Sequence, residues 1–472
     1  MLFSDTPAPD VQNALRDVTY APFWLADPAA PAPTPPLDQH ITTDLLIVGA
    51  GFTGLWTALL AKERDPQREV VIVDADRVVG QASARNGGFL HASLTHGLPN
   101  GVAKFADELP TLLELGKQNF AAIRAFVHEH GIDCDWRDSG EIEYAMQPHE
   151  VDEVREHVEF AQRYGEDYRW LDADELRTRI NLPHALGAMF EPTTVAMVNP
   201  ARLGWGLRDV ALQRGVRFFE HTEVVRLEHR GNSVVAHTAS ASITANRIAL
   251  TTNAARSLLP AVRRRIVPVY DYQLATEPLT TQQWASVGWD GFEGIKGAGN
   301  RFHYARRTAD GRILWGGFDA VYHWRNGVGA RFEHDPLMYA KLATHFRAMF
   351  PQLADVRFTH AWGGAIDTCS RFAPFWVGAH GGRVQAVAGF TGLGVGSSRF
   401  AAEVLLDRLD GVGSRVAGLA MVHTLPTPFP PEPARSAVVA LTRWSLARAD
   451  ARGGRRNLWL RLLDVLGLGF DS

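Results

Sequence analysis

The sequence predicts an α/β protein in which a doubly wound βαβ domain is interleaved with a second, α+β domain that contains a mixed sheet. An apolar strand, a glycine turn, a helix and a second apolar strand follow one another over residues 43–75. Such a unit is typical of a parallel sheet that is buried on both faces. Residues 215–254 and 266–320 alternate like antiparallel strands, and a length of 472 residues allows two or three domains.

The first 40 residues are predicted to form an extended arm. The stretch PFWLADPAAPAPTPPLDQH is too rich in proline for a helix or a sheet, because proline fixes φ and lacks a hydrogen-bond donor. We expect Phe23 and Trp24 to anchor this arm on the body of the protein.

Further elements follow from local patterns. Residues 109–131 and 150–165 are predicted to be amphipathic helices, and the Asp-Gly pair within 308–318 predicts a hairpin turn. A proline-rich link, TLPTPFPPEPAR, precedes C-terminal helices that carry arginines over residues 443–469. These arginines suit a solvated face, a partner or an anionic surface, and the sequence leaves the three alternatives open.

Composition excludes several classes of function. The net charge of -4 does not favour nucleic acid or an anionic membrane as the main partner. Cys134 and Cys369 are the two cysteines, so a disulfide framework and a thiolate metal site are not expected. The sequence has no apolar run of 18 residues and no signal-peptide pattern, so we expect a cytoplasmic protein without a membrane span.

Three glycines mark the end of the first predicted strand. Gly49, Gly51 and Gly54 form G-x-G-x-x-G, and Asp74 follows the last of them by 20 positions, at the end of the second strand. The glycines allow a tight turn, close approach of a pyrophosphate and close packing of helix on strand, and the carboxylate can bind ribose hydroxyls. The spacing therefore predicts a dinucleotide site, and an aspartate at position 74 favours an unphosphorylated adenosine ribose.

Two further segments distinguish FAD from NAD. GQASARNGGFLHAS (80–93) resembles the G-A-S-G-R-N-G-G segment of the D-amino-acid-oxidase-like flavoproteins, although Gln81 and Ala84 replace the usual glycines. VQAVAGFTGLGVGSSRFAAEVLLDRL (384–409) resembles the last flavin segment of the same family, with a helix expected from about Ser397. The amides at that helix start would face the flavin edge where negative charge collects on reduction.

The likeness covers nearly the whole chain from Phe23 and points to the gamma-glutamylputrescine-oxidase-like branch of that superfamily. It implies a flavin fold of the glutathione-reductase/DAO type and non-covalent FAD. The cofactor-binding residues that it implies are Gly49, Ala50, Gly51, Phe52, Thr53, Gly54, Asp74, Ala75, Ala82, Ser83, Arg85, Asn86, Gly87, Gly88, Phe89, Val224, Gly364, Gly389, Phe390, Thr391, Gly392, Gly394 and Val395.

The resemblance also implies a domain plan and an activity. The FAD-binding domain would comprise 41–110, 195–265 and 355–415, and the substrate domain 111–194 and 266–354, between an N-terminal arm (1–40) and a C-terminal helical arm (416–472). The implied reaction oxidises a C–N bond of a small amine to an imine, with O2 or another electron acceptor taking up the electrons. The main alternative is an FAD-dependent oxidase or dehydrogenase of an amino acid, such as glycine, sarcosine or a D-amino acid. A flavin-dependent hydroxylase and a flavin-binding structural protein are the others.

Candidates for the substrate side are taken from the same likeness. Gly363 and Gly364 stand where amino-acid oxidases of this superfamily place an arginine for the substrate carboxylate, so an amine is favoured over an amino acid. Lys296 is a candidate for the site where oxygen reacts. The expected catalytic residues are Tyr304, Trp362, His91, Tyr272 and His303, with Tyr270, Asp367 and Arg371 as further lining candidates.

Overall fold

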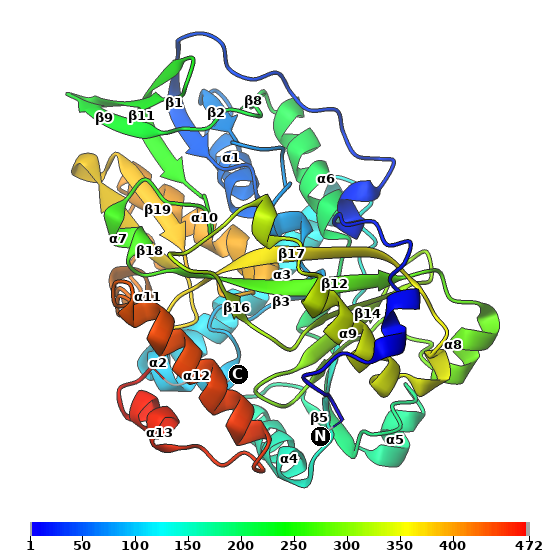
Figure 1. Ribbon diagram of the computed structural model, residues 1–472. Coiled ribbons are helices and arrows are strands. Elements are labelled where there is room, and N and C mark those ends of the chain that lie inside the picture. The colour runs from blue at the N-terminus through cyan, green and yellow to red at the C-terminus, as the bar shows by residue number, and fades with distance from the viewer. Residues whose placement is uncertain (1, 469–472) are drawn as a thin grey trace.

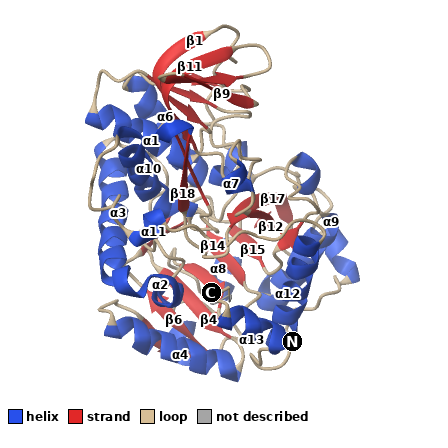
Figure 2. Ribbon diagram, turned by 90° about the vertical axis from the view of Figure 1, so that its left-hand side faces the viewer, coloured by secondary structure: helices blue, strands red, loops and turns tan. Residues whose placement is uncertain are grey.

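Two large sheets organise the chain, of which the computed structural model describes residues 2–468. The first has eight strands in the order β18-β19-β11-β1-β2-β8, with β9 and β10 forming a hairpin on β11, and Figures 1 and 2 show it at one end of the molecule. Its strands are β1 (Ile41–Val48), β2 (Val70–Val73), β8 (Arg217–Phe219), β9 (Arg226–Arg230), β10 (Ser233–His237), β11 (Ser242–Leu250), β18 (Phe375–Ala379) and β19 (Val384–Ala388).

The predicted βαβ unit is confirmed at the centre of this sheet. β1 pairs in parallel with β2 and β11, and its residues 45–48 are buried, as expected for a strand covered on both faces. Helix α1 (Phe52–Arg64) follows and packs against α6 (Pro200–Gln213) and α10 (Gly394–Asp410). α10 begins three residues before the predicted Ser397.

The second sheet has nine strands in the order β16-β12-β15-β14-β13-β4-β6-β5, with β17 paired to β12. The predicted hairpin is confirmed, since β14 and β15 pair antiparallel around the Asp-Gly turn. The sequence predicts that the FAD-binding domain resumes at residue 355. The structure differs, because β17 follows this residue and belongs to the second sheet. The strands are β4 (Glu141–Ala145), β5 (Arg169–Asp172), β6 (Gly187–Glu191), β12 (Val267–Thr276), β13 (Gly294–Gly297), β14 (His303–Arg307), β15 (Ile313–Gly317), β16 (Val321–Tyr322) and β17 (Phe358–Thr368).

A third, separate sheet consists of two antiparallel strands, β3 (Phe89–His91) and β7 (Val195–Met197). The predicted helices near 109 and 150 are confirmed as α3 and α4. Within residues 2–468, no helix is both long and apolar enough to cross a membrane. The remaining helices are α2 (Leu98–Phe105), α3 (Leu109–Glu129), α4 (Pro148–Arg163), α5 (Ala173–Arg177), α7 (Pro260–Arg263), α8 (Thr281–Val287), α9 (Pro336–Met349), α11 (Ala420–His423), α12 (Ala434–Asp450) and α13 (Leu458–Val465).

The N-terminal arm runs over the body as predicted, with short 3-10 turns at Pro9–Asn13 and Phe23–Ala26. Trp24 is 3% exposed and packs into the core between the two domains. Phe23 contacts the ring of His360 on β17, and the indole of Trp24 donates a hydrogen bond to the main chain of Asn86. The arm is therefore fixed to both domains.

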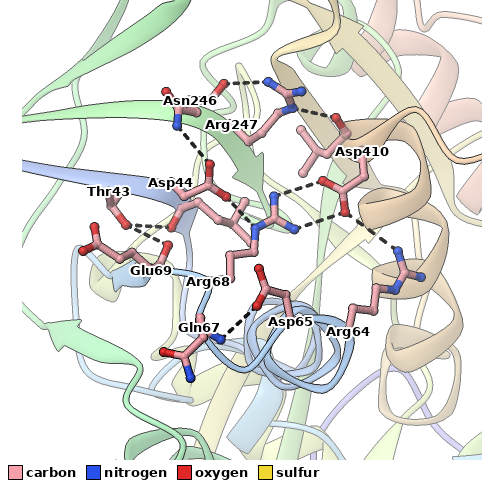
Figure 3. Close-up of polar contacts among 12 residues, drawn as sticks. Thr43, Asp44, Arg64, Asp65, Gln67, Arg68, Glu69, Asn246, Arg247 and Asp410 are labelled. Carbon is pink, nitrogen blue, oxygen red and sulfur yellow. Dashed lines mark hydrogen bonds and ion pairs between the residues drawn. The ribbon is translucent and has the colours of Figure 1, made fainter.

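An ion-pair network closes the edge of the first sheet where β1 and β2 begin (Figure 3). Nε of Arg68 donates to Asp44 at 2.7 Å, and Nη2 of the same guanidinium group lies 3.0 Å from Asp410 Oδ1. Arg64 lies 2.7 Å from Asp407 at the end of α10. The glycine turns lie at the opposite, carboxyl edge of these strands, so this network ties helix ends together and leaves the other edge for a ligand.

We expect Arg68→Ala to lower the free energy of unfolding by about 2 kcal/mol, because it leaves two carboxylates without their charged donor. Denaturation with urea, followed by circular dichroism, measures this change. Arg230→Ala is the matched control. Its side chain is 62% exposed beside Glu228, and its loss should leave the free energy of unfolding nearly unchanged. Equal losses in the two variants would contradict the assigned role of the network.

Candidate functional site

The first glycine turn leaves no room for side chains. Gly49 has φ +111°, and a Cβ there would lie 2.7 Å from the carbonyl oxygen of Thr251 on the neighbouring chain segment. A Cβ on Gly54 would lie 1.9 Å from the oxygen of Gly49, so α1 packs directly on the turn. Each glycine is thus required by close contact of main-chain atoms.

The start of α1 presents main-chain amides to the same turn. Gly51 caps the helix without a side-chain hydrogen bond, and the amide of Phe52 donates to Ser83 Oγ at 3.0 Å. The second predicted flavin segment therefore begins beside the first. Amides at a helix start carry partial positive charge, which favours a phosphate group there.

Asp74 lies at the carboxyl end of β2, next to the glycine turn. Its Oδ2 accepts the amide of Ala50 at 2.6 Å, and its Oδ1 accepts the amide of Asp76 at 2.8 Å. Burial raises the pKa of this carboxyl group, against the effect of the two amides. Its main-chain oxygen accepts the amide of Thr222, which brings the buried Val224 to the same edge.

The second segment is shaped by its own asparagine. The side chain of Asn86 donates to the carbonyl oxygens of Ala82 and Ser83 at 2.9 and 3.0 Å and accepts the amide of Gly88 at 2.8 Å. A Cβ on Gly88 would lie 2.2 Å from the oxygen of Val198. Asn86 thus folds the segment into a compact turn, and the glycine lets the turn pass the main chain of its neighbour.

Three side chains from distant parts of the chain hold this turn from outside. The carbonyl oxygen of Arg85 accepts Gln273 Nε2 at 2.6 Å and Trp362 Nε1 at 3.1 Å. The next carbonyl, of Asn86, accepts Trp24 Nε1 at 2.8 Å. The arm, β12 and β17 therefore all donate to two successive main-chain oxygens of the second segment.

The third segment is held by a buried carboxyl group. Asp367, at 1% exposure on β17, accepts the amides of Gly389 at 2.6 Å and Phe390 at 3.1 Å. Burial raises the pKa of Asp367 to about 7, although these amides lower it. Thr391 and Gly392 then adopt positive φ, and a Cβ on Gly392 would project into open space.

α10 starts against the strand that follows the second segment. A Cβ on Gly396 would lie 2.0 Å from the carbonyl oxygen of His91 in β3, so helix and strand are in direct contact. The start of α10 has no side-chain cap among its hydrogen bonds. The second and third segments thus meet, and the start of α10, like that of α1, lies against the second segment.

Strand alternation decides which residues of the second sheet face the second segment. On β12, Asp271 and Gln273 point to it, and their partners on β17, Gly364 and Trp362, share that face. A Cβ on Gly364 would lie 3.1 Å from Arg85 Cβ. We call the sheet surface that carries these residues and Tyr304 the inner face.

Tyr304 and Asp271 form a hydrogen-bonded pair on the inner face. The hydroxyl group of Tyr304 donates to Asp271 Oδ2 at 2.5 Å, and Asp271 Oδ1 accepts the amide of Gly317 at 3.1 Å. Burial raises the pKa of Asp271 to about 6. Glycines make room for the ring, since a Cβ on Gly87 would lie 2.8 Å from Tyr304 Cε2 and one on Gly316 would lie 2.6 Å from its hydroxyl oxygen.

Three carboxyl groups, Glu141, Glu143 and Glu191, continue the inner face, and we call them the carboxylate cluster. Lys296 is the direct cross-strand neighbour of both Tyr304 and Glu143, and its ammonium lies 3.1 Å from Glu141 and 3.3 Å from Glu143. Burial opposes the charge of Lys296, but the carboxylates outweigh it and raise the pKa of this lysine.

His91 connects the carboxylate cluster to the second segment. Its Nε2 lies 3.7 Å from Glu141 Oε1, and one ligand atom each of His91, Glu141 and Glu191 lie within 4.8 Å of one another. Lys296 already supplies a cation 3.1 Å from Glu141. The cluster is therefore read as a charged lining and not as a metal centre.

The arrangement fits FAD. The glycine turn and Asp74 suit the adenosine and pyrophosphate, two helix starts without side-chain caps suit the phosphate and flavin edges, and open space lies before Gly392. Comparison with known families decides the question: residues 44–408 match the family described as DAO, FAD dependent oxidoreductase. The chain belongs to this family. FAD is accordingly its cofactor, whereas non-covalent attachment stays a prediction.

Relatives of the DAO-family chain extend over most of its length. Gamma-glutamylputrescine oxidoreductase of Escherichia coli (strain K12) is 29% identical over 415 residues, which are 86% of this chain and 92% of the relative. A probable oxidoreductase, OrdL, of Haemophilus influenzae is 26% identical over 395 residues, covering 81% and 86% of the two chains.

Solved structures share the DAO-family fold at lower identity. Glycine oxidase from Geobacillus kaustophilus has a TM-score of 0.66 at 19% identity and covers 81% of this chain and 99% of its own. L-proline dehydrogenase from P. horikoshii has a TM-score of 0.65 at 15% identity, with coverage of 81% and 96%. These likenesses confirm the predicted fold class.

The structure separates the predicted catalytic residues into two groups. Tyr304, Trp362 and His91 lie on or beside the inner face, although the indole of Trp362 is engaged with Arg85. Tyr272 and His303 lie on the other face of the sheet, because each is adjacent in sequence to an inner-face residue.

Tyr272 and His303, on the other face of the sheet, are held in the core around α9. His303 is fully buried, contacts the carbonyl oxygen of Gly316 at 3.0 Å and His345 at 2.8 Å, and stacks on Trp315. Tyr272 donates to the carbonyl oxygen of Phe332 at 2.7 Å, and the hydroxyl group of Tyr270 accepts the amide of Gly329 at 3.0 Å. The structure does not bring these side chains to the flavin segments.

Arg371 and Cys369 are likewise engaged elsewhere. The guanidinium group of Arg371 donates to the carbonyl oxygens of Ala373, Pro374 and Thr424, so it holds main chain rather than facing the inner face. Cys369 is fully buried against Gly389. Asp367, predicted as a lining residue, instead holds the third flavin segment.

Sequence reasoning missed Asp271, Gln273 and the carboxylate cluster. A signal for the cluster was present, because Glu141 and Glu143 alternate with Ile142 and Tyr144 and therefore share one face of a strand. The partners of Asp271 and Gln273 lie far away in the chain, and no local pattern indicates them.

We expect Gly54→Ala to yield protein that retains little FAD, because the added methyl group would collide with Gly49 and push α1 away from the turn. The flavin absorbance per protein after gel filtration measures retention. Gly413→Ala is the control, since a Cβ there meets nothing within 4 Å. Full retention of FAD by Gly54→Ala would contradict the predicted role of the turn.

Proposed function

We propose that this protein oxidises a C–N bond of a primary or secondary amine to an imine, which water then hydrolyses to an aldehyde or oxo product. The observation that carries the proposal is the inner face, where the carboxylate cluster and the Tyr304–Asp271 pair lie beside the second flavin segment. When bound, FAD supplies the acceptor for a hydride, which carries the two electrons of the oxidation.

The carboxylate cluster favours a cationic substrate. Glu141 is 3% exposed and Glu191 is 8% exposed, and Lys296 forms ion pairs with Glu141 and Glu143. Charges in a partly buried site interact strongly, because water screens them less than at the surface. An alkylammonium ion would be attracted to this lining.

The Tyr304–Asp271 pair suits the removal of a proton from the substrate. An alkylammonium ion has a pKa of about 10, so it arrives protonated and must lose a proton before its carbon can give up a hydride. Asp271, with its pKa raised to about 6, is a carboxylate at neutral pH. We assign Tyr304 as the group that contacts the amine and Asp271 as the group that receives the proton through the tyrosine hydroxyl.

Two glycines in the middle of β17 argue against a simple amino acid. Gly363 and Gly364 offer no charge there, and the guanidinium group of Arg371 is occupied by carbonyl oxygens. The name of the Escherichia coli relative specifies gamma-glutamylputrescine, which makes gamma-glutamyl amines the first class to test. Lys296, beside Tyr304, stays the predicted position for reaction with O2, and another acceptor is the alternative.

The decisive experiment mixes the purified FAD-loaded protein with amines in the absence of oxygen. Gamma-glutamyl amines or polyamines are expected to bleach the flavin absorbance near neutral pH, and readmission of air then shows whether O2 restores it. N-methyl amino acids and D-amino acids form the comparison panel. Bleaching by D-amino acids alone would replace the proposal with an amino-acid oxidase, and a protein that takes up no FAD would end it.

We expect Asp271→Asn and Tyr304→Phe to slow flavin reduction about 100-fold, the usual contribution of a positioned proton acceptor. In the unaltered protein, kcat/KM should fall below about pH 6, as Asp271 takes up its proton and can no longer accept one. Asp271→Asn should lack this acid limb. Rapid-mixing absorbance measurements across pH test both points.

Tyr339→Phe is the matched control, because this tyrosine lies on α9 and donates to the carbonyl oxygen of Glu333, away from the inner face. It should keep the rate and the pH profile of the unaltered protein. An acid limb that persists in Asp271→Asn would contradict the assignment of Asp271.

A further inference from the structure

The C-terminal arm is fixed to the body through its inner side. α13 packs on α12, where Trp459 donates to Thr442 Oγ1 at 2.9 Å and Asn457 donates to Ser445 Oγ at 2.9 Å. α12 in turn is held to the second domain, because Asn300 donates to Asp450 at 2.7 Å. Figures 1 and 2 show both helices lying along the surface of the molecule.

The outer side of α13 is apolar and exposed. Leu458 is 84% exposed, Leu462 48% and Val465 85%, and their spacing of four and three residues places them on one helical stripe. Leu460 and Leu463, on the other side of the helix, are buried. Half of the apolar side chains of α13 therefore pack against the protein, and the other half are exposed to solvent.

Arginines surround this stripe. Residues 434–468 contain seven arginines and two aspartates, although the whole chain has a net charge of -4. Arg452, Arg455 and Arg461 are exposed, and Arg461 lies on the stripe itself, next to Leu458 and Leu462. The segment that carries the exposed apolar stripe therefore has an excess of positive charge.

We propose that the outer side of α13, with its exposed arginines, docks reversibly on the surface of an anionic lipid bilayer. A helix with an apolar stripe beside arginines lies in the interface of such a bilayer, with apolar side chains among the acyl chains and arginines at the headgroups. The eight residues of α13 are far too few to cross it. A second copy of this chain suits the surface less well, because the cores of protein interfaces are depleted of charge and Arg461 lies within the stripe.

Sedimentation of the FAD-loaded protein with vesicles tests the proposal. Vesicles of phosphatidylcholine and phosphatidylglycerol should carry the protein down, whereas phosphatidylcholine alone should not. The variant Leu458→Ser/Leu462→Ser/Val465→Ser should reduce the bound fraction about tenfold or more, since it removes the side chains that would enter the bilayer. Arg452→Glu/Arg455→Glu should reduce it as well, and high salt should release the unaltered protein.

Leu337→Ser is the control variant, because this leucine is 66% exposed on α9 and lies outside the arm. It should sediment like the unaltered protein, and the flavin spectrum of each variant verifies that it is folded. Equal binding to both kinds of vesicle, or none to either, would overturn the proposal. A dimer in light scattering that the triple variant dissociates, without vesicle binding, would identify a second copy as the partner instead.

Discussion

The arrangement of the two domains depends on two neighbouring carbonyl oxygens, those of Arg85 and Asn86. Trp24, Gln273 and Trp362 donate to them from the N-terminal arm and from two strands of the second sheet. A buried carbonyl group without a donor would cost free energy, so the second flavin segment, the arm and the sheet each need the others in place. The same hydrogen bonds fix the distance between the flavin segment and the inner face on which substrate chemistry is proposed.

The glycine turns could be predicted from sequence because close main-chain contact restricts the residue type directly. Gly49, Gly54 and Gly396 each face main-chain atoms at distances that exclude a Cβ. Their spacing along the chain therefore records the geometry of the turn and of the helix packing. The predicted start of α10 was three residues late, because Gly394 and Gly396 lie inside the helix and not in the turn before it.

The inner face could not be predicted in the same way. Tyr304 and His303 are adjacent, and the aromatic character of both suits a pocket, but strand alternation sends only Tyr304 toward Gly87. Which of the two turns inward depends on the register of β14 with β15, set by residues elsewhere in the sheet. Asp367 could not be assigned from sequence for the same reason. It lies near the expected site in the chain, yet its carboxyl group accepts hydrogen bonds from amides of the third segment.

The interleaving of the two domains has a consequence for biosynthesis. β11 lies beside β19 in the first sheet, although some 130 residues of mostly second-domain chain separate them. A ribosome makes β1, α1 and β2 early, yet the edge that completes their sheet emerges only after β12 to β17 have left the exit tunnel. The complete cofactor site can therefore form only after β19 and the start of α10 have been made, and the nascent first half must avoid aggregation until then.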